Sequence, residues 1–468
     1  MALHAAGPNW SMWVPTASAT GQPFSAACAA ARDVRSGLVV GFGHRDDTAA
    51  MSHPAHPSPT PLERPDFVPK RIDRASRGRG ATMLLLLTVV VCAGWSLVFS
   101  DRQVRAASDT PIALWSWRRE LPEQVVVDRA VTETGARPLF VRAGTLDSGR
   151  DGITRIRETT GVCPAGIDIH FVYNATPELL EEFETSDVGE MADVVIASYE
   201  LDAARAIEAG SAVCGLQLDL DVPTRLLPRY GELLRAVDAR LPEGSQLSVT
   251  GLPTWMTSKD LPAMLEPVDF WIPQFYGGAV PRDVRDTTPI ASIEQVRAGV
   301  RRARRLGKPF FAGLAAYGYT LQFNADGSLR ALHGTVDPAR VAASPDVDVV
   351  GETAPGGVAA NRRLTYRVHT ASVLDGFVIA PGDWIVVEVP SAELLRESAR
   401  AAREEGGGAL IGMCVVRLPE GGDRTVLDIG AIGAALADRA IPDASTVVGI
   451  DGMTRDSKPA RVRRIAAH

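Results

Sequence analysis

The chain has few cysteines and no cysteine pattern typical of a metal or redox site. Its 468 residues include five, Cys28, Cys92, Cys163, Cys214 and Cys414, and none stands in a CxxC or CxxxC spacing. This excludes zinc ribbons and thioredoxin-like redox motifs. Only three cysteines follow residue 108, so at most one disulfide forms there. We therefore expect the fold to depend on its hydrophobic core.

The chain also lacks an excess of positive charge in the part expected to fold. Its net charge is −7, with +3 in residues 1–80 and −10 in residues 81–468. An acidic folded part argues against nucleic-acid binding. With 46% hydrophobic and 22% charged residues, the composition is that of a globular protein, which excludes wholesale disorder, collagen and a polytopic membrane protein.

One long uncharged run is present, ATMLLLLTVVVCAGWSLVF at residues 81–99. It follows a basic flank made of Lys70, Arg71, Arg74, Arg77 and Arg79. This pattern predicts a signal peptide or transmembrane anchor over 81–100, with the N-terminus in the cytoplasm and the rest exported to the periplasm or the medium. Val104-Arg105-Ala106 is a candidate cleavage site, so a cleaved signal and an uncleaved anchor both remain open.

Residues 1–80 show no sustained helical or strand period and are rich in Ala, Pro, Ser, Gly, Arg and His. Such composition predicts a disordered extension. The alternative is that translation begins at Met83, at the head of the apolar run, and that the upstream residues are not part of the protein.

Residues 109–420 show short apolar runs that alternate with helical patterns, as in βα units of a parallel sheet. The predicted strands number eight: 112–117, 138–144, 167–174, 213–221, 246–253, 268–276, 309–317 and 408–418. Eight such units predict a (β/α)₈ TIM barrel.

Helix signals lie between several of these strands. Pro228 opens an amphipathic helix after the fourth strand, Gly307 ends another after the sixth, and Ser391 is a candidate N-cap for 392–404. Residues 320–390 predict a small β-rich hairpin module inserted between strands 7 and 8, on the face where barrels bind ligands. Residues 421–468 predict one helix, 428–440, and a disordered tail.

The fourth strand separates its two faces most clearly. Leu216, Leu218 and Leu220 alternate with Gln217, Asp219 and Asp221, so we expect the leucines to face the helices and the polar set to face the barrel interior. Buried carboxylates are costly unless they are hydrogen-bonded or lie near solvent. Other strands place polar groups toward the same end: Asp168, His170, Asn174, Ser248, Thr250, Gln274, Tyr276 and Arg417. This layout predicts a TIM-barrel active site.

Each of these residues also has a structural interpretation. Asp219 and Asp221 could satisfy buried donors, and His170 could be an interior histidine. Trp117, Trp255 and Tyr317 are either core and rim residues or platforms for sugar stacking. Gln217 and Gln274 either fill a hydrogen-bond network or bind hydroxyl groups.

Five segments together resemble a bacterial TIM-barrel family catalogued as a domain of unknown function and related to glycoside hydrolases. The resemblance covers about 110–420. The segments are ALWSW (113–117), CGLQLDLD (214–221), VTGLPTW (249–255), VDFWIPQFYG (268–277) and VVRLP (415–419).

CGLQLDLD is also distantly similar to the Asp-Gly-x-Asp-x-Asp-x-Glu strand of family 18 chitinases. In that register Asp221 stands at the catalytic Glu, Asp219 at the preceding Asp and Gln217 at the Asp before it. Cys214 stands at the first Asp, and QFY places Tyr276 at the tyrosine that assists the substrate acetamide. Asp221 is one methylene shorter than Glu, and Gln217 cannot share a proton with Asp219.

The first hypothesis is a glycoside hydrolase acting on an extracellular or cell-wall polysaccharide without a cofactor or metal. Asp221 would be the general acid/base, assisted by Asp219 and Tyr276. The expected substrate-binding residues are Gln217, Gln274, Trp255, Trp117, Tyr317 and Arg417. The alternative is a catalytically inactive glycan-binding barrel. A third hypothesis is a metal-dependent hydrolase using Asp168, His170, Asp219 and Asp221, although no HxxxH or HExxH accompanies them.

Overall fold

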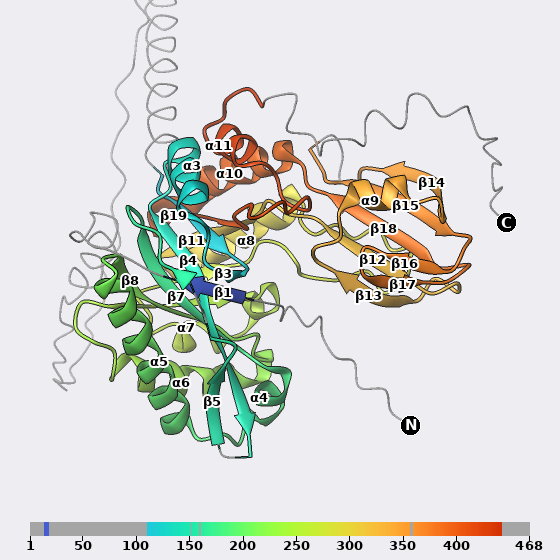
Figure 1. Cartoon of the computed structure of the whole chain (residues 1–468). Helices are drawn as coiled ribbons and strands as arrows, with labels where there is room; N and C mark the ends of the chain where they lie inside the picture. The colour runs from blue at the N-terminus through green and yellow to red at the C-terminus, as the bar shows by residue number, and fades with distance from the viewer. Residues whose placement is uncertain (1–13, 18–109, 151, 159–160, 356–358, 442–468) are drawn as a thin grey trace, which may run out of the picture. The chain divides into compact units, whose positions relative to one another are not determined.

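The structure is a computed structural model, which describes residues 14–17, 110–150, 152–158, 161–355 and 359–441. Eight parallel strands form a closed barrel, because β2 pairs with both β4 and β19 (Figure 1). In barrel order they are β2 (Ile112–Ser116), β4 (Pro138–Gly149), β7 (Asp168–Ala175), β8 (Ala212–Asp219), β9 (Gln246–Gly251), β10 (Phe270–Pro273), β11 (Phe310–Ala315) and β19 (Leu410–Val416). The predicted (β/α)₈ fold is confirmed, and each predicted strand overlaps one of these.

The helices lie between the barrel strands and after the last one. They are α3 (Gln124–Thr134), α4 (Pro177–Glu182), α5 (Val188–Glu208), α6 (Leu227–Asp238), α7 (Leu261–Met264), α8 (Ile293–Leu306), α10 (Ala392–Gly406) and α11 (Ile429–Leu436). Short 3₁₀ turns occupy Thr224–Leu226, Pro253–Thr257 and Gly407–Ala409.

The helix ends follow the signals in the sequence. Gly307 ends α8 with a φ of 72°, which is a left-handed conformation suited to glycine. The Ser391 hydroxyl accepts a hydrogen bond from the Leu394 amide at the start of α10. The predicted helix 428–440 is shorter than expected, because α11 ends at Leu436.

One barrel unit departs from the expected pattern. After β4 the chain forms no helix but turns back into β5 (Gly152–Ile156), which pairs antiparallel with the end of β4. This hairpin packs against α5. Asp202 of α5 forms a buried ion pair with Arg155 of β5 and accepts a hydrogen bond from the Tyr173 hydroxyl. A small parallel sheet of β1 (Val14–Ala17), β3 (Arg119–Glu120) and β6 (Gly161–Val162) completes the part before β7.

The insertion between β11 and β19 occupies nearly the residues that the sequence predicted, and it has more strands than a single hairpin module. It is a five-stranded antiparallel sheet in the order β13-β12-β18-β15-β14, with a separate hairpin and one helix. Its elements are β12 (Tyr319–Phe323), β13 (Leu329–His333), α9 (Pro338–Ala343), β14 (Val347–Thr353), β15 (Arg362–Val368), β16 (Ser372–Leu374), β17 (Phe377–Ile379) and β18 (Trp384–Val389).

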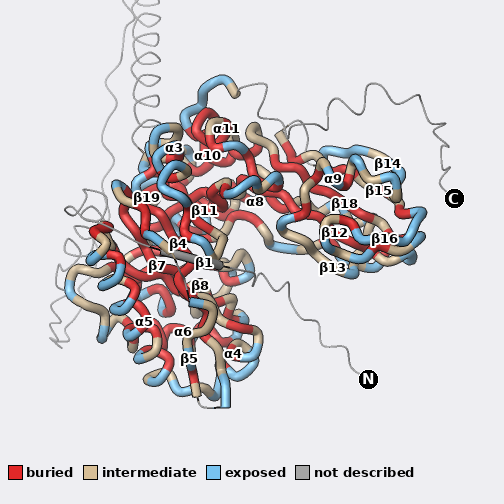
Figure 2. The backbone as a smooth tube through the Cα atoms, viewed as in Figure 1, coloured by how far each residue is buried: buried red, intermediate tan, exposed pale blue. Residues whose placement is uncertain are grey.

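The alternation of side chains along the strands produces two apolar layers in the barrel. Leu216, Leu218 and Leu220 pack among the helices, in the outer layer. An inner layer, which includes Phe140 and Phe270, fills the barrel and continues into the insertion. Figure 2 shows the barrel strands as mostly buried.

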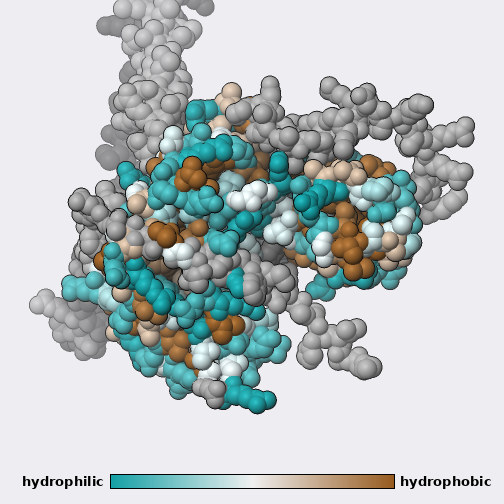
Figure 3. All heavy atoms as spheres, viewed as in Figure 1, coloured by the Kyte–Doolittle hydropathy of each residue, from teal (hydrophilic) through white to brown (hydrophobic). Residues whose placement is uncertain are grey.

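The visible surface is largely polar, with small apolar areas (Figure 3). The most exposed large apolar side chains of the insertion are Val349, Val350, Val373 and Val378. Scattered apolar residues of this kind are ordinary on a soluble protein surface.

The predicted signal or anchor at 81–100 lies outside the described residues. So do the extension at 1–80, apart from 14–17, and the tail beyond 441. Among the helices that the structure describes, none combines the length and the apolar character needed to cross a bilayer.

Candidate functional site

Polar side chains gather inside the barrel around β8. Gln217, fully buried, accepts a hydrogen bond from the indole nitrogen of Trp115 (3.1 Å) and donates one to the Ser248 hydroxyl (3.3 Å). These contacts join the interior faces of β2, β8 and β9. The predicted inward orientation of Gln217 and Asp219 is therefore present in the structure.

Asp219 is held by its neighbours on both sides. The Thr250 hydroxyl of β9 donates to one carboxylate oxygen, and the Asn174 amide of β7 donates to the other. The positive charge of Arg142 on β4 also acts on this carboxylate. Burial raises the pKa of Asp219, but these three groups oppose the shift because they favour the ionised form.

Asp221 stands in a different environment two residues further along. Its side chain makes no hydrogen bond to any of the described residues, and it keeps partial contact with solvent. Burial and then the negative charge of Asp219 raise the pKa of Asp221 to about 7. Since only Asp219 has donors and a cation beside it, Asp219 is the member that carries the charge and Asp221 the member that holds the proton near neutral pH.

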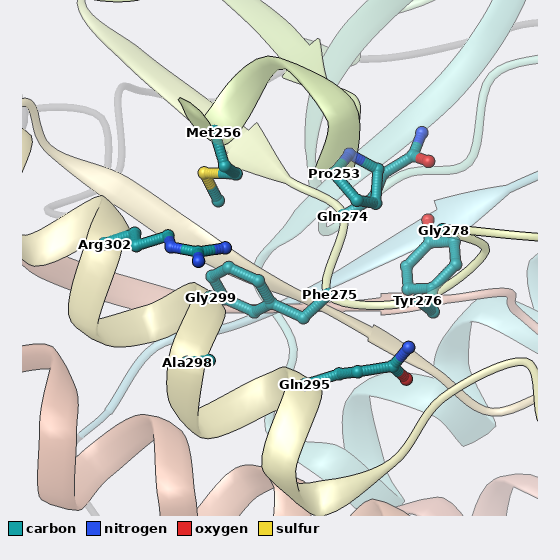
Figure 4. A pocket seen from close by; sticks show the side chains of 10 residues that line it. All are labelled: Pro253, Met256, Gln274, Phe275, Tyr276, Gly278, Gln295, Ala298, Gly299 and Arg302. Atoms are coloured by element: carbon teal, nitrogen blue, oxygen red, sulfur yellow. The ribbon is translucent and has the colours of Figure 1, made fainter. Parts of the chain in front are cut away.

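Tyr276 and Gln274 lie at the end of β10. The Tyr276 ring belongs to the inner layer and meets the Tyr317 ring edge to face, with centroids 5.9 Å apart. Burial raises the pKa of Tyr276 well above its usual value, so its hydroxyl stays protonated. Both residues border a cavity of about 170 Å³ (Figure 4), which is lined by Pro253, Met256, Gln274, Phe275, Tyr276, Gly278, Gln295, Ala298, Gly299 and Arg302.

The four other predicted binding residues differ in accessibility. Trp117 is half-buried, and its ring lies 5.7 Å from that of Trp115. Trp255 is 1% exposed, lies in the outer layer and donates its indole N–H to the Val222 carbonyl. Arg417 is bound to Asp423, Thr425 and the Gly334 carbonyl. Its guanidinium lies 5.7 Å from the centroid of the buried Tyr317 ring. Trp117 is thus partly accessible, whereas Trp255, Tyr317 and Arg417 are buried.

His170 lies among aromatic rings and not beside the carboxylates. Its ring stacks on Phe140 at 4.7 Å and meets Phe270 edge to face. Desolvation lowers the pKa of His170 to about 3, so it is neutral. Asp168 is the first residue of β7, at the opposite end of that strand from Asn174. In the described part of the chain, no three His, Cys, Asp or Glu side chains are grouped to hold a metal ion.

Sequence reasoning missed two charged residues of this region. Arg142 is 3% exposed and faces inward beside Asp219; burial lowers its pKa to about 10. Along β4, Phe140 and Arg142 alternate with Leu139 and Val141 of the outer layer. This alternation in the sequence could have predicted that Arg142 faces the barrel interior. Glu420, beyond β19, accepts a hydrogen bond from the Ser116 hydroxyl (2.8 Å), and burial raises its pKa to about 7.

Residues 192–344 match the model of a family described as a domain of unknown function, DUF3142. The matched segment runs from α5 through α9 and includes Gln217, Asp219, Asp221, Gln274 and Tyr276. The match confirms the resemblance to a family of unknown function over these residues. No curated protein sequence matches the chain.

Solved structures with a similar fold include enzymes that act on chitin or on the spore cortex. The chitinase from Chromobacterium violaceum is 14% identical, with a TM-score of 0.48 over 70% of this chain and 98% of that one. The spore cortex-lytic enzyme SleL from Bacillus cereus is 16% identical, with a TM-score of 0.46 over 71% of this chain and 75% of that one. At these identities the likeness concerns the fold alone.

Proposed function

We propose that the protein is a glycoside hydrolase that acts on an extracellular or cell-wall polysaccharide, with Asp221 as the general acid. The observation that carries this proposal is the unequal pair of carboxyl groups on β8. Asp219 has two hydrogen-bond donors and Arg142 beside it, which oppose the effect of burial on its pKa, whereas Asp221 has none of these and a pKa raised to about 7. Glycosidases need such a division, because one carboxyl must stay protonated to donate a proton at working pH.

The reaction would begin with proton transfer from Asp221 to the glycosidic oxygen as the bond to the leaving sugar breaks. The charged Asp219 would stabilise the positive charge that develops on the sugar ring. Water would then add its hydroxyl to the anomeric carbon and give its remaining proton to the deprotonated Asp221, which restores the acid. Tyr276, Gln274 and Trp117 are the proposed sugar contacts. This scheme requires the glycosidic oxygen to approach Asp221 to about 2.6–3.2 Å.

A second candidate function is a catalytically inactive glycan-binding barrel. Gln217 favours it, since its amide is engaged by Trp115 and Ser248 and can neither take nor give a proton to Asp219. The apolar run at 81–99 supports export in both cases, so we propose an extracytoplasmic location, with a membrane contact through 81–100 if that segment is retained.

Substitution of Asp221 by Asn separates the two candidates. We expect Asp221→Asn to reduce the release of reducing ends by about 10²- to 10⁴-fold while glycan binding persists. The assay uses a panel of bacterial exopolysaccharides and peptidoglycan, with pull-down on the insoluble polymers to measure binding. Asp168→Asn, at the other end of the barrel, is the matched control. Unchanged turnover in Asp221→Asn would refute the role of Asp221, and binding without turnover in the wild type would favour the inactive barrel.

A further inference from the structure

The loop between β10 and α8 starts immediately after Tyr276 and is closed at its base by one hydrogen bond. The Gly277 amide donates to the Ile290 carbonyl at 2.7 Å. Gly277 has a φ of 69°, a left-handed conformation that favours glycine. The position of Ile290 therefore fixes where the chain leaves Tyr276.

Ile290 is in turn bound to the insertion. Its amide donates at 3.0 Å to the carboxylate of Glu388 on β18, a side chain only 3% exposed. The same oxygen of Glu388 accepts a hydrogen bond from the Asn361 amide at 3.3 Å, and the Asn361 oxygen accepts from the Ser391 amide at 3.0 Å. Glu388 thus joins the β10–α8 loop to the insertion and to the start of α10.

The main chain of Glu388 also lies close to the residue that follows Tyr317, whose ring meets that of Tyr276. Tyr317, which meets the Tyr276 ring, is followed by Gly318, and a Cβ on Gly318 would lie 1.8 Å from the Glu388 carbonyl oxygen. Gly318 is therefore required for this close approach. Tyr276 is therefore followed by a loop whose Ile290 binds Glu388, and Tyr317 is followed by a glycine that lies close to Glu388.

We propose that Glu388 is a positioning residue for Tyr276, acting through Ile290 and Gly277, and that the insertion thereby sets the geometry of the barrel mouth. The inference rests on the proposed function for its catalytic consequence. Its structural part, a loop base held by Glu388, stands without that function. Removing the carboxylate frees the Ile290 amide and with it the base of the loop.

The test needs a control that weakens the insertion without touching the loop. Asp383, 4% exposed, accepts hydrogen bonds from the Ala380 amide (3.1 Å) and Gln322 (3.0 Å) and forms an ion pair with Arg330 (3.0 Å). It is thus a buried carboxylate immediately before β18, with comparable bonds and no hydrogen-bond or ion-pair partner in the β10–α8 loop among the described residues. Loss of Glu388 also removes one of the acidic groups that interact with the buried Arg363, the other being Asp286. This makes the stability control necessary.

Hydrogen exchange of the full chain tests the structural part. We expect Glu388→Ala to accelerate exchange at the Gly277 and Ile290 amides at least tenfold, whereas Asp383→Ala, with a similar loss of Tm, leaves them unchanged. Glu388→Gln keeps an acceptor and should restore most of the protection. Equal protection in Glu388→Ala and the wild type, or equal loss in Asp383→Ala, would overturn the proposal.

A double-mutant cycle with Tyr276→Phe tests the coupling. We expect Glu388→Ala to lower kcat about tenfold with less than a twofold change in KM, and to have less than a twofold effect when Tyr276 is already Phe. Equal effects in both backgrounds would contradict positioning through Tyr276. If the wild type hydrolyses no glycan, the proposed function fails. A crystal structure of Glu388→Ala then decides the inference: a displaced Tyr276 ring supports it and an unmoved ring overturns it.

Discussion

Asp221 differs from the other carboxyl groups of the barrel because no donor compensates its burial. In the folded state its pKa is about 7, above the ordinary value of 3.8. Between these two values the folded protein holds a proton that the unfolded chain releases, so Asp221 makes stability fall as pH rises. The free energy of unfolding would fall by at most about 1.4 kcal/mol per pH unit in this range. The partial solvent contact of Asp221 makes the actual decrease smaller.

Asp221→Asn should therefore stabilise the protein more at high pH than at low pH. We expect the Tm difference between Asp221→Asn and the wild type to grow by about 2 °C or more between pH 4.5 and pH 8. Thermal unfolding followed by circular dichroism at both pH values provides the measurement. A difference independent of pH would mean that Asp221 titrates near 4 in the folded state.

Individual residues also show which side-chain contacts a sequence pattern cannot predict. Alternation placed Asp219 on the correct face, but it could not show that Thr250 and Asn174 hold this carboxylate, because those contacts join three separate strands. Trp255 illustrates the opposite problem. An aromatic side chain near the end of a strand is compatible with a sugar platform and with the core, and only the Tyr230 ring and the Val222 carbonyl around it decide for the core.

At the scale of elements, periodicity identified the strands because the two faces of a barrel strand pack in different layers, one among the helices and one inside the barrel. The β4–β5 hairpin escaped this reasoning, since its Ser-Gly-Arg-Asp-Gly turn region is polar and suggests a loop. The insertion was predicted as β-rich with nearly its observed bounds, but its five-stranded topology was not predicted. Its strands pair between β12, β15 and β18, far apart in sequence, and local patterns carry no information on such pairing.

Gly215 on β8 offers a test of strand packing near the site. A Cβ at this position would lie 2.1 Å from the carbonyl oxygen of Gln246 on the adjacent β9. Because backbone cannot move aside as a flexible side chain does, we expect Gly215→Ala to lower the free energy of unfolding by at least about 2–3 kcal/mol. Gly408→Ala is the control, since nothing lies within 4 Å of its added Cβ. Urea unfolding of both variants measures the effect, and equal stabilities would contradict the described packing.

For the whole molecule, the barrel and the insertion share one apolar layer. Leu321, Phe323 and Val386 of the insertion belong to the same cluster as Trp115, Phe140 and Phe270 inside the barrel. Splitting this cluster would expose apolar surface on both parts. The insertion is therefore a structural continuation of the barrel interior and not a separate appended module.

We expect residues 110–441 of the full chain to unfold in one cooperative transition. Differential scanning calorimetry should give a single endotherm whose calorimetric and van't Hoff enthalpies agree. The fluorescence of Trp384 in the insertion should change together with the circular dichroism of the barrel. Two resolved endotherms, with Trp384 responding to only one of them, would show that the shared layer does not couple the parts.

The electrostatic coupling of Asp219 and Asp221 is the central requirement of the proposed mechanism, and the pH dependence of hydrolysis measures this coupling directly. With a polysaccharide that the wild type cleaves, kcat/KM should fall above about pH 7 as Asp221 loses its proton. In Asp219→Asn the residual activity should fall at a lower pH, because burial alone then raises the Asp221 pKa and the added effect of the negative charge is gone. A descending limb at the same pH in both proteins would contradict the assignment of Asp221 as the acid.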